Sequence, residues 1–330
     1  MPVHVARFEH EDRIRWGVVR GPEIRPIDAE LPTTADLVEY AASHHLSDAS
    51  GHTLQVTDVE ILSPVTRNQQ LICQGANYRV HMIESGIDPD QKSFNMFFRK
   101  ASSAIVPASA DIVRPSHVTL LDYEVELGLV VKREMTTPVR VTKENLHQWI
   151  AGVVIVNDVS ARDVQIPQMQ FYKGKSYRTF APVGPYLCLL GEGEMRVLDD
   201  LRLSLTVNGE MRQSASTSEL VHKPAETLTE LSGLQDLHPG DLIATGTPSG
   251  CALAVPSPTV QRVSALLPEP LRWKLFHRAQ AKRPQYLKPG DVVESRITSP
   301  DGAVDLGVQH NRVLPETRGQ TPLAAQVGAP

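Results

Sequence analysis

Two glutamates lie two residues apart at the start of an apolar run. Glu124 and Glu126 belong to the segment Asp122-Tyr-Glu-Val-Glu-Leu-Gly-Leu-Val-Val. Side chains alternate along a β-strand, so both carboxylates would point to the same face. Like charges at this spacing repel each other unless a cation or a basic group lies between them. The pair therefore indicates part of a cation site, with a solvated strand edge as the alternative.

A third carboxylate follows a second apolar run. Asp158 ends the segment Ala151-Gly-Val-Val-Ile-Val-Asn-Asp, where its oxygen atoms are available either to a metal or to the cap of a turn. Three carboxylates, with no Cys or His at zinc spacing, favour a hard cation that prefers oxygen ligands. Mg²⁺, Mn²⁺ and Ca²⁺ all meet this condition, so the residue types leave the choice among them open.

A candidate base lies nearer the N-terminus. His81 and Glu84 occur in Gly75-Ala-Asn-Tyr-Arg-Val-His-Met-Ile-Glu-Ser-Gly, which has the length of a short helix closed by glycine. Residues three apart are neighbours on a helix, so Glu84 would orient the imidazole and raise its basicity. A pair on the protein surface is the alternative interpretation of this spacing.

Two glycine-containing loops offer further polar groups. The segment Lys173-Gly-Lys175-Ser-Tyr-Arg178 presents a lysine but lacks the upstream glycine pattern of a P-loop, so it does not indicate nucleotide binding. The segment Thr245-Gly246-Thr247-Pro-Ser-Gly combines free N–H groups with a hydroxyl, which suits an anion such as a carboxylate. Ordinary solvated loops are the alternative for both.

The elements that must position these groups are mainly strands. Short apolar runs rich in Val, Ile and Leu and broken by Pro and Gly predict strands near residues 71–73, 104–106, 126–132, 152–156, 186–190, 201–207 and 241–244. Pro239-Gly-Asp and Pro289-Gly-Asp predict two similar tight turns before strands in a rolled sheet. Helices are expected at 34–43, 77–85, 143–149, 225–232 and inside 260–281.

The chain divides into three parts by this pattern. Residues 1–66 form a small N-terminal module, residues 67–314 form a larger domain dominated by strands, and residues 315–330 form a disordered tail rich in Gly, Pro, Thr, Gln and Ala. The expected fold class is mixed α/β with a predominance of β-strands.

Composition excludes several classes of partner. The formal net charge is −5 and no run of Lys and Arg forms a basic stripe, so nucleic acid is not an expected partner. No segment approaches the roughly 18 consecutive apolar residues of a membrane span, and the N-terminus lacks a signal sequence. The three cysteines lack CxxC spacing, which indicates reduced thiols and a cytoplasmic location.

Together these segments resemble the fumarylacetoacetate hydrolase family. The family motifs NYxxHxxE, FxK, YExEL, NDxSARDxQ, GKS, GTPxG and PGD all occur in this chain, over roughly residues 70 to 313. They stand at Asn77–Glu84, Phe98–Lys100, Tyr123–Leu127, Asn157–Gln165, Gly174–Ser176, Gly246–Gly250 and Pro239–Asp241. The resemblance implies a rolled mixed β-sheet catalytic domain, a homodimer and a Mg²⁺ or Mn²⁺ site, with Ca²⁺ as a substitute.

The resemblance also implies a role for each candidate residue. The metal ligands would be Glu124, Glu126 and Asp158. The catalytic residues would be His81 and Glu84 as the base pair, with Lys175 and Gln165 polarising the substrate. The substrate-binding residues would be Thr247, Gly246 and Lys100.

The implied reaction is hydrolysis of a carbon–carbon bond in a 2,4-dioxo acid of the acylpyruvate or fumarylpyruvate type, through a metal-bound enolate, in the catabolism of aromatic compounds. His81 would activate water for this step. The alternatives on the same site are decarboxylation of an oxo diacid, isomerisation of a 2-hydroxydienoate and dehydration of a sugar-derived oxo acid. A binding protein that keeps the fold without catalysis is an alternative of another class.

The sequence departs from the family pattern in two places. Arg178 stands where many relatives have an acidic residue, which predicts a preference for a substrate with a second carboxylate. The stretch from Cys251 to Tyr286 is longer than in many prokaryotic relatives. Its apolar residues would either cover the site or extend a dimer contact, and the sequence does not choose between these roles.

Overall fold

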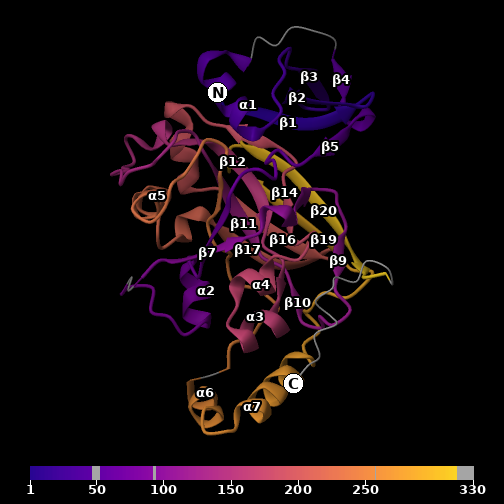
Figure 1. Cartoon of the computed structure of the whole chain (residues 1–330), viewed down its shortest axis with the longest axis vertical. Coiled ribbons are helices and arrows are strands. Elements are labelled where there is room, and N and C mark those ends of the chain that lie inside the picture. The colour runs from indigo at the N-terminus through magenta and orange to yellow at the C-terminus, as the bar shows by residue number, and fades with distance from the viewer. Residues whose placement is uncertain (47–52, 92–93, 257, 318–330) are drawn as a thin grey trace.

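The computed structural model describes residues 1–46, 53–91, 94–256 and 258–317. The N-terminal strands lie at one end of the molecule, the body is built of β-strands, and helices α2, α3, α4, α6 and α7 lie at the opposite end (Figure 1). Over these residues, none of the helices has the length and apolar character to cross a membrane. The mixed α/β fold dominated by strands, with a small N-terminal module, is confirmed.

The N-terminal strands extend the main sheet. They are β1 (Val3–His10), β2 (Arg13–Arg20), β3 (Glu23–Pro26), β4 (Leu54–Gln55) and β5 (Glu60–Leu62). Helix α1 (Thr34–Ser43) has the predicted bounds and begins with a capping box between Thr33 and Asp36. Strand β1 pairs with β15 (Leu187–Leu189) of the body. This part of the chain therefore shares a sheet and a hydrophobic core with the rest of the protein.

The centre of this sheet carries the residues that matter for function. Its order continues from β1 through β15, β12 (Ile150–Asn157), β11 (Val125–Val131), β18 (Leu242–Ala244), β6 (Leu71–Gly75) and β7 (Met96–Lys100). Strands β14 (Ala181–Val183) and β8 (Ile105–Pro107) join it beside β12. Every residue of β11 and β12 is buried, which explains their nearly continuous apolar sequences.

A second sheet packs near β11 and β12, with the order β17 (Glu210–Ser216), β16 (Arg202–Val207), β19 (Val292–Thr298), β20 (Asp305–Pro315) and β9 (Ile112–Arg114). A short ladder joins β10 (Leu121–Asp122) to β13 (Ser160–Ala161). The two predicted turns are confirmed as similar. The Asp241 carboxylate accepts a hydrogen bond from His238 N before β18, and the Asp291 carboxylate accepts one from Lys288 N before β19.

Several helices differ from the prediction. Helices α2 (Arg79–Glu84) and α5 (Pro224–Ser232) lie within or next to the predicted ranges. The expected helix at 143–149 is only a 3₁₀ turn, Leu146–Gln148. The single helix expected inside 260–281 is replaced by two helices, α6 (Pro258–Ser264) and α7 (Glu269–Gln280). They are separate because the prolines at 268 and 270 start a new helix. The other 3₁₀ turns are Val56–Asp58, Ser102–Ala104, Glu192–Asp199 and Thr217–Glu219.

Two helices were not expected at all. They are α3 (Arg162–Gln168) and α4 (Phe171–Lys175). The interpretation of Lys175 as a loop residue was therefore wrong, since it is the last residue of α4. Both helices are too short to show a clear apolar period, which is why the sequence pattern missed them. At the other end of the body, Pro315 still pairs with Arg114 in the sheet; residues 318–330 of the expected tail lie outside the described residues.

Candidate metal centre and active site

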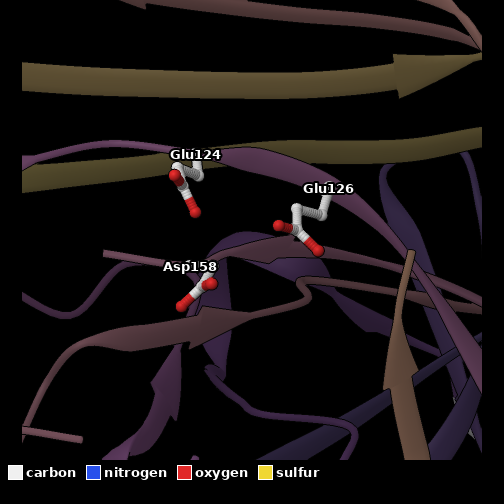
Figure 2. A group of neighbouring side chains, drawn as sticks. All are labelled: Glu124, Glu126 and Asp158. Carbon is white, nitrogen blue, oxygen red and sulfur yellow. The ribbon is translucent and has the colours of Figure 1, made fainter. Parts of the chain in front are cut away.

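The three predicted metal ligands come together in the structure. Strands β11 and β12 run antiparallel with Val125 opposite Asn157, so Glu124 and Asp158, which flank this pair, lie side by side. The Asp158 amide donates to the Glu124 carbonyl at 2.8 Å, which fixes this register. One ligand oxygen from each of Glu124, Glu126 and Asp158 lies within 4.8 Å of the others, and all three residues are buried. Their carboxylates converge on one space (Figure 2).

Two lysines neutralise part of this acidic cluster. Lys175 Nζ donates to Glu124 Oε2 at 2.5 Å and to Asp158 Oδ2 at 2.6 Å. Helix α4 can bring Lys175 this close because Gly174 lies directly against Gln165 of α3, where a Cβ atom would lie 2.7 to 2.8 Å from Gln165 atoms. Lys100, at the end of β7, donates to Asp158 Oδ1 at 2.5 Å and to the carbonyl of Phe180.

Arg162 is an important residue to which the sequence assigned no role. Its guanidinium pairs with Glu124 and, at 2.8 Å, with Asp122 Oδ2, while Nη1 donates to Gln165 Oε1 at 2.8 Å. All four side chains are buried. The sequence did contain both partners, since Arg162 lies within the family motif at Asn157–Gln165 and Asp122 begins the segment that holds Glu124 and Glu126. The spacing of carboxylates alone does not show which cation will bind them.

Glu126 differs from its neighbours because no cation pairs with it among the described residues. Its carboxylate accepts a hydrogen bond from Gly246 N at 2.8 Å. Burial, followed by the charges of Asp158 and Glu124, raises the pKa of Glu126 well above its usual value. For Glu124 burial acts in the same direction, but Arg162 and Lys175 outweigh it and lower its pKa to about 2. Glu126 is therefore the carboxylate of the cluster whose charged form has no cationic partner among the described residues.

This charge pattern fits a bound divalent cation. Four buried carboxylates, of Asp122, Glu124, Glu126 and Asp158, face three buried cations, of Lys100, Arg162 and Lys175. These groups carry one more negative than positive charge, and three of the carboxylates converge. Arg162, Lys175 and Lys100 occupy the oxygen atoms of Glu124 and Asp158. Hard cations such as Mg²⁺ and Mn²⁺ prefer such oxygen ligands. The residues present thus suit the metal that the sequence predicted.

A cavity of about 530 Å³ opens onto the carboxylates. Several residues that the sequence singled out for substrate or catalysis line it: His81, Glu84, Gln165, Lys175 and Thr247. The Thr247 hydroxyl, however, donates to the Val125 carbonyl at 3.1 Å and accepts from Gln213 Nε2 at 2.9 Å. Thr247 therefore anchors its loop to β11. Gly246, at a φ of 90° that favours glycine, directs its amide to Glu126.

His81 and Glu84 both lie on α2, but they do not form the expected pair. Within the described residues no hydrogen bond or ion pair joins them, and Glu84 is exposed while His81 is half-buried. Burial lowers the pKa of His81, with a smaller opposing effect from Glu124 and a lowering effect from Arg162. The imidazole is thus favoured in its neutral form, which can accept a proton.

Two predicted substrate-binding residues lie away from the cavity. Lys100 is buried behind Asp158 and does not line the cavity wall. Arg178 is exposed and is also absent from the wall. The structure therefore gives Lys100 a positioning role towards Asp158 and leaves Arg178 outside the site.

Replacing Lys100 with methionine is expected to lower the free energy of unfolding by about 3 to 5 kcal/mol, because it breaks a buried ion pair and leaves Asp158 with less compensation. Chemical denaturation followed by circular dichroism measures this change. Lys173→Met is the matched control, since Lys173 is exposed and its Nζ contacts Gln168. Equal, small changes in both variants would contradict a structural role for Lys100.

The long stretch from Cys251 to Tyr286 contributes directly to the cavity. Its two ends supply Cys251, Leu253, Ala254, Val255 and Arg283 to the wall. Helices α6 and α7 project beyond these ends, away from the sheets (Figure 1). Leu266, between the two helices, is 86% exposed. The ends of the stretch therefore form part of the site, whereas its helices lie outside the cavity wall.

Known proteins resemble the chain over most of its length. It is 39% identical over 199 residues to the oxaloacetate tautomerase YisK of Bacillus subtilis, a match that covers 59% of this chain and 64% of that protein. It is 32% identical over 260 residues to the mitochondrial oxaloacetate tautomerase FAHD2B of Bos taurus, covering 78% and 70%. The solved fumarylacetoacetate hydrolase of Exiguobacterium antarcticum has a TM-score of 0.71 and 28% identity, covering 95% of this chain and 100% of that one.

Family models account for both parts of the chain. Residues 3–64 match the model described as "Rv2993c-like, N-terminal". Residues 70–314 match the model of the fumarylacetoacetate hydrolase C-terminal domain, and this region contains the acidic cluster, Arg162, Lys175 and the cavity. The protein belongs to the fumarylacetoacetate hydrolase family.

Proposed function

We propose that the protein interconverts the keto and enol forms of a 2-oxo diacid of the oxaloacetate type, with Mg²⁺ or Mn²⁺ held by Glu124, Glu126 and Asp158. The observation that carries this proposal is the cavity in which the half-buried His81 faces a carboxylate cluster already paired with Lys175 and Arg162. The relatives named as oxaloacetate tautomerases support the same reaction.

The reaction moves one proton from carbon to oxygen and shifts the double bond from C=O to C=C, and it breaks no bond between heavy atoms. A base removes a proton from the carbon next to the carbonyl, and a proton is then delivered to the carbonyl oxygen. A divalent cation in the carboxylate cluster supplies Lewis-acid polarisation of the carbonyl. In this proposal neutral His81 takes the proton from carbon and, as the imidazolium, returns it to oxygen.

Lys175 and Arg162 would stabilise negative charge without giving up their protons. Burial disfavours the charged form of Lys175, but Asp158 and Glu124 outweigh this effect and raise its pKa. Arg162 remains charged between Asp122 and Glu124. Fixed positive charges next to the substrate oxygen favour the enolate over the keto form, because they need no rearrangement when the charge develops.

The hydrolysis expected from the sequence receives less support from the geometry. Activation of water was assigned to His81 held by Glu84, and no contact between these two side chains is present among the described residues. Proton transfer at carbon needs one base at the cavity wall, whereas hydrolysis also needs a positioned water molecule. Decarboxylation of the same diacid uses the same polarised carbonyl and is the nearest competing reaction.

The direct test starts from the enol form of oxaloacetate and follows the loss of its ultraviolet absorbance with protein and Mg²⁺. We expect a rate well above that of the same metal in buffer, and a return to the buffer rate with excess EDTA. Parallel samples of oxaloacetate, acetylpyruvate and fumarylpyruvate are analysed by NMR for carbon dioxide release and for cleavage. Rapid cleavage or decarboxylation with no acceleration of ketonisation would overturn the proposal.

Metal binding should also be visible without any substrate. Adding Mg²⁺ or Mn²⁺ to metal-free protein is expected to raise the free energy of unfolding by about 2.7 kcal/mol at one hundred times Kd, because the folded carboxylate cluster binds the ion and the unfolded chain does not. Thermal unfolding monitored by fluorescence measures the shift. Potassium at equal ionic strength is the control, and Glu60→Gln, on an exposed residue, should keep the shift. An equal shift with potassium would contradict a specific site.

The homodimer and the cytoplasmic location expected from the sequence remain predictions, as does its division at residues 66 and 314. Light scattering on the purified protein, with and without Mg²⁺, gives the mass in solution. A mass of one chain at all concentrations would exclude the dimer.

A further inference from the structure

We infer that Arg283 binds the second carboxylate of the substrate and so makes the site selective for diacids over monoacids. This inference rests on the proposed function, because it concerns the same cavity. Arg283 follows α7, in the stretch between Cys251 and Tyr286, and it lines the cavity that is also lined by Glu124, Glu126 and Asp158. Arg178, which the sequence favoured for this role, lies outside that cavity.

Arg283 is held by a segment that is itself hydrogen-bonded to Asp122, beside the carboxylate cluster. Its Nε donates to the Ala252 carbonyl at 2.9 Å. The amides of Ala252 and Leu253 in turn donate to the Asp122 carboxylate at 2.7 and 3.1 Å, and Asp122 pairs with Arg162. A continuous chain of contacts therefore connects the guanidinium to the carboxylate cluster, so its position relative to a substrate on the metal is set by the fold.

A second contact holds the two ends of this stretch together. Gln280 Nε2 donates to the Ala254 carbonyl at 2.8 Å, Gln280 Oε1 accepts from Ala254 N at 3.3 Å, and Tyr286 Oη donates to the same oxygen at 2.9 Å. Gln280 and Tyr286 are both buried. Arg283 thus lies on a braced turn, which reduces the loss of conformational freedom when it binds a ligand.

The guanidinium of Arg283 has N–H donors that have no partner among the described residues. Over the described residues the side chain of Arg283 forms no ion pair, and its only hydrogen bond is the one from Nε to the Ala252 carbonyl. The other two cations of the cavity wall, Arg162 and Lys175, are already paired with carboxylates. The remaining N–H groups of an arginine form a planar fork that matches both oxygens of a carboxylate. A carboxylate group on the substrate is the ligand that this geometry suits.

The charge of the site points to the same substrate class. The buried cluster has one excess negative charge, so a divalent cation leaves one excess positive charge, which one carboxylate of a 2-oxo acid neutralises. A second carboxylate would then be uncompensated in a partly enclosed cavity, which is unfavourable. Arg283 supplies the one further positive charge that a diacid requires. A 2-oxo monoacid would leave the guanidinium without a partner.

Binding of two stable 2-hydroxy acids tests this inference without any turnover. Malate carries the second carboxylate and lactate lacks it, and calorimetry with Mg²⁺-loaded protein gives Kd for each. We expect the wild type to bind malate about tenfold more tightly than lactate. Arg283→Gln should remove this preference while leaving lactate binding unchanged, and Arg283→Lys should keep part of it. Arg178→Gln, the matched control on an exposed arginine, should bind both acids as the wild type does.

The outcomes separate this inference from the proposed function. An unchanged malate-to-lactate ratio in Arg283→Gln, with normal thermal unfolding, overturns the role of Arg283. Loss of the preference in Arg283→Gln supports it, even if the wild type fails to accelerate ketonisation of oxaloacetate. In that last case the proposed keto–enol interconversion would be wrong, and the role of Arg283 in diacid selectivity would stand.

Discussion

A Glu126→Gln variant should lose metal-dependent activity and yet be at least as stable as the wild type in the absence of metal. Glu126 is buried without a cationic partner among the described residues, and its carboxylate accepts a hydrogen bond from Gly246 N. Glutamine is of similar size and its amide oxygen can accept the same hydrogen bond. The substitution therefore removes a buried ionisable group without a cationic partner and at the same time removes one of the three proposed metal ligands.

The pH dependence of stability should change with this substitution. The pKa of Glu126 is raised in the folded protein, so the folded state holds a proton more tightly than the unfolded chain. The free energy of unfolding of the metal-free protein should therefore fall as the pH rises from the ordinary glutamate pKa, about 4.3, to the raised pKa of Glu126 in the folded protein. Glutamine cannot titrate, so the variant should lose this decline.

Glu124→Gln is the matched control, with the opposite expected sign. The pKa of Glu124 is lowered to about 2 in the folded protein, so Glu124 stabilises the fold above its ordinary pKa and this contribution is lost as the pH falls towards 2. Its replacement leaves Arg162 and Lys175 less compensated and should cost about 3 kcal/mol. Urea unfolding in EDTA between pH 5 and pH 8 measures both variants. Equal destabilisation by both would contradict the assigned charge distribution.

A His81→Gln variant should lose about 10² to 10⁴ in kcat, because His81 is the neutral base at the cavity wall in our proposal. Glu84→Gln should change kcat by much less, since Glu84 is exposed and makes no contact with His81 within the described residues. The ketonisation rate of oxaloacetate, measured at saturating Mg²⁺, gives both values.

This pair of variants separates proton transfer from hydrolysis. A hydrolytic base pair requires both residues, so equal losses in the two variants would show that Glu84 supports His81 during turnover. Loss of Mg²⁺ binding in His81→Gln would instead mean that the substitution lowers kcat by disturbing the metal site. The Mg²⁺-induced shift in thermal unfolding checks this point.

The sequence contained most of the metal centre. The spacing of Glu124 and Glu126, and the position of Asp158 after an apolar run, indicated three candidate oxygen ligands, because strand geometry fixes which face a side chain occupies. The family resemblance joined them into one predicted metal site, and the structure brings the three carboxylates together. The long apolar runs of β11 and β12 were also predicted, since buried strands need nearly continuous apolar sequences.

The missing parts depend on contacts between distant segments. Arg162 pairs with Asp122 and Glu124 across about forty positions of sequence, and no local period shows that pairing. Arg283 reaches the cavity only because the chain returns from α7 and is braced by Ala252. Arg178, by contrast, lies close to Lys175 in sequence but is exposed and does not line the cavity. Sequence proximity to a residue of the cavity wall was a poor guide to position in the site.

Exchange of the carbon-bound protons of oxaloacetate for deuterium is the decisive test of the proposed keto–enol interconversion. The substrate is mixed with protein and Mg²⁺ in heavy water, and proton NMR follows the C3 signal beside a sample with the same metal and no protein. We expect faster exchange at C3 with protein, dependent on Mg²⁺ and lost in Glu126→Gln, with little release of pyruvate. Exchange at the protein-free rate, together with cleavage of acetylpyruvate to pyruvate and acetate, would contradict the proposed interconversion.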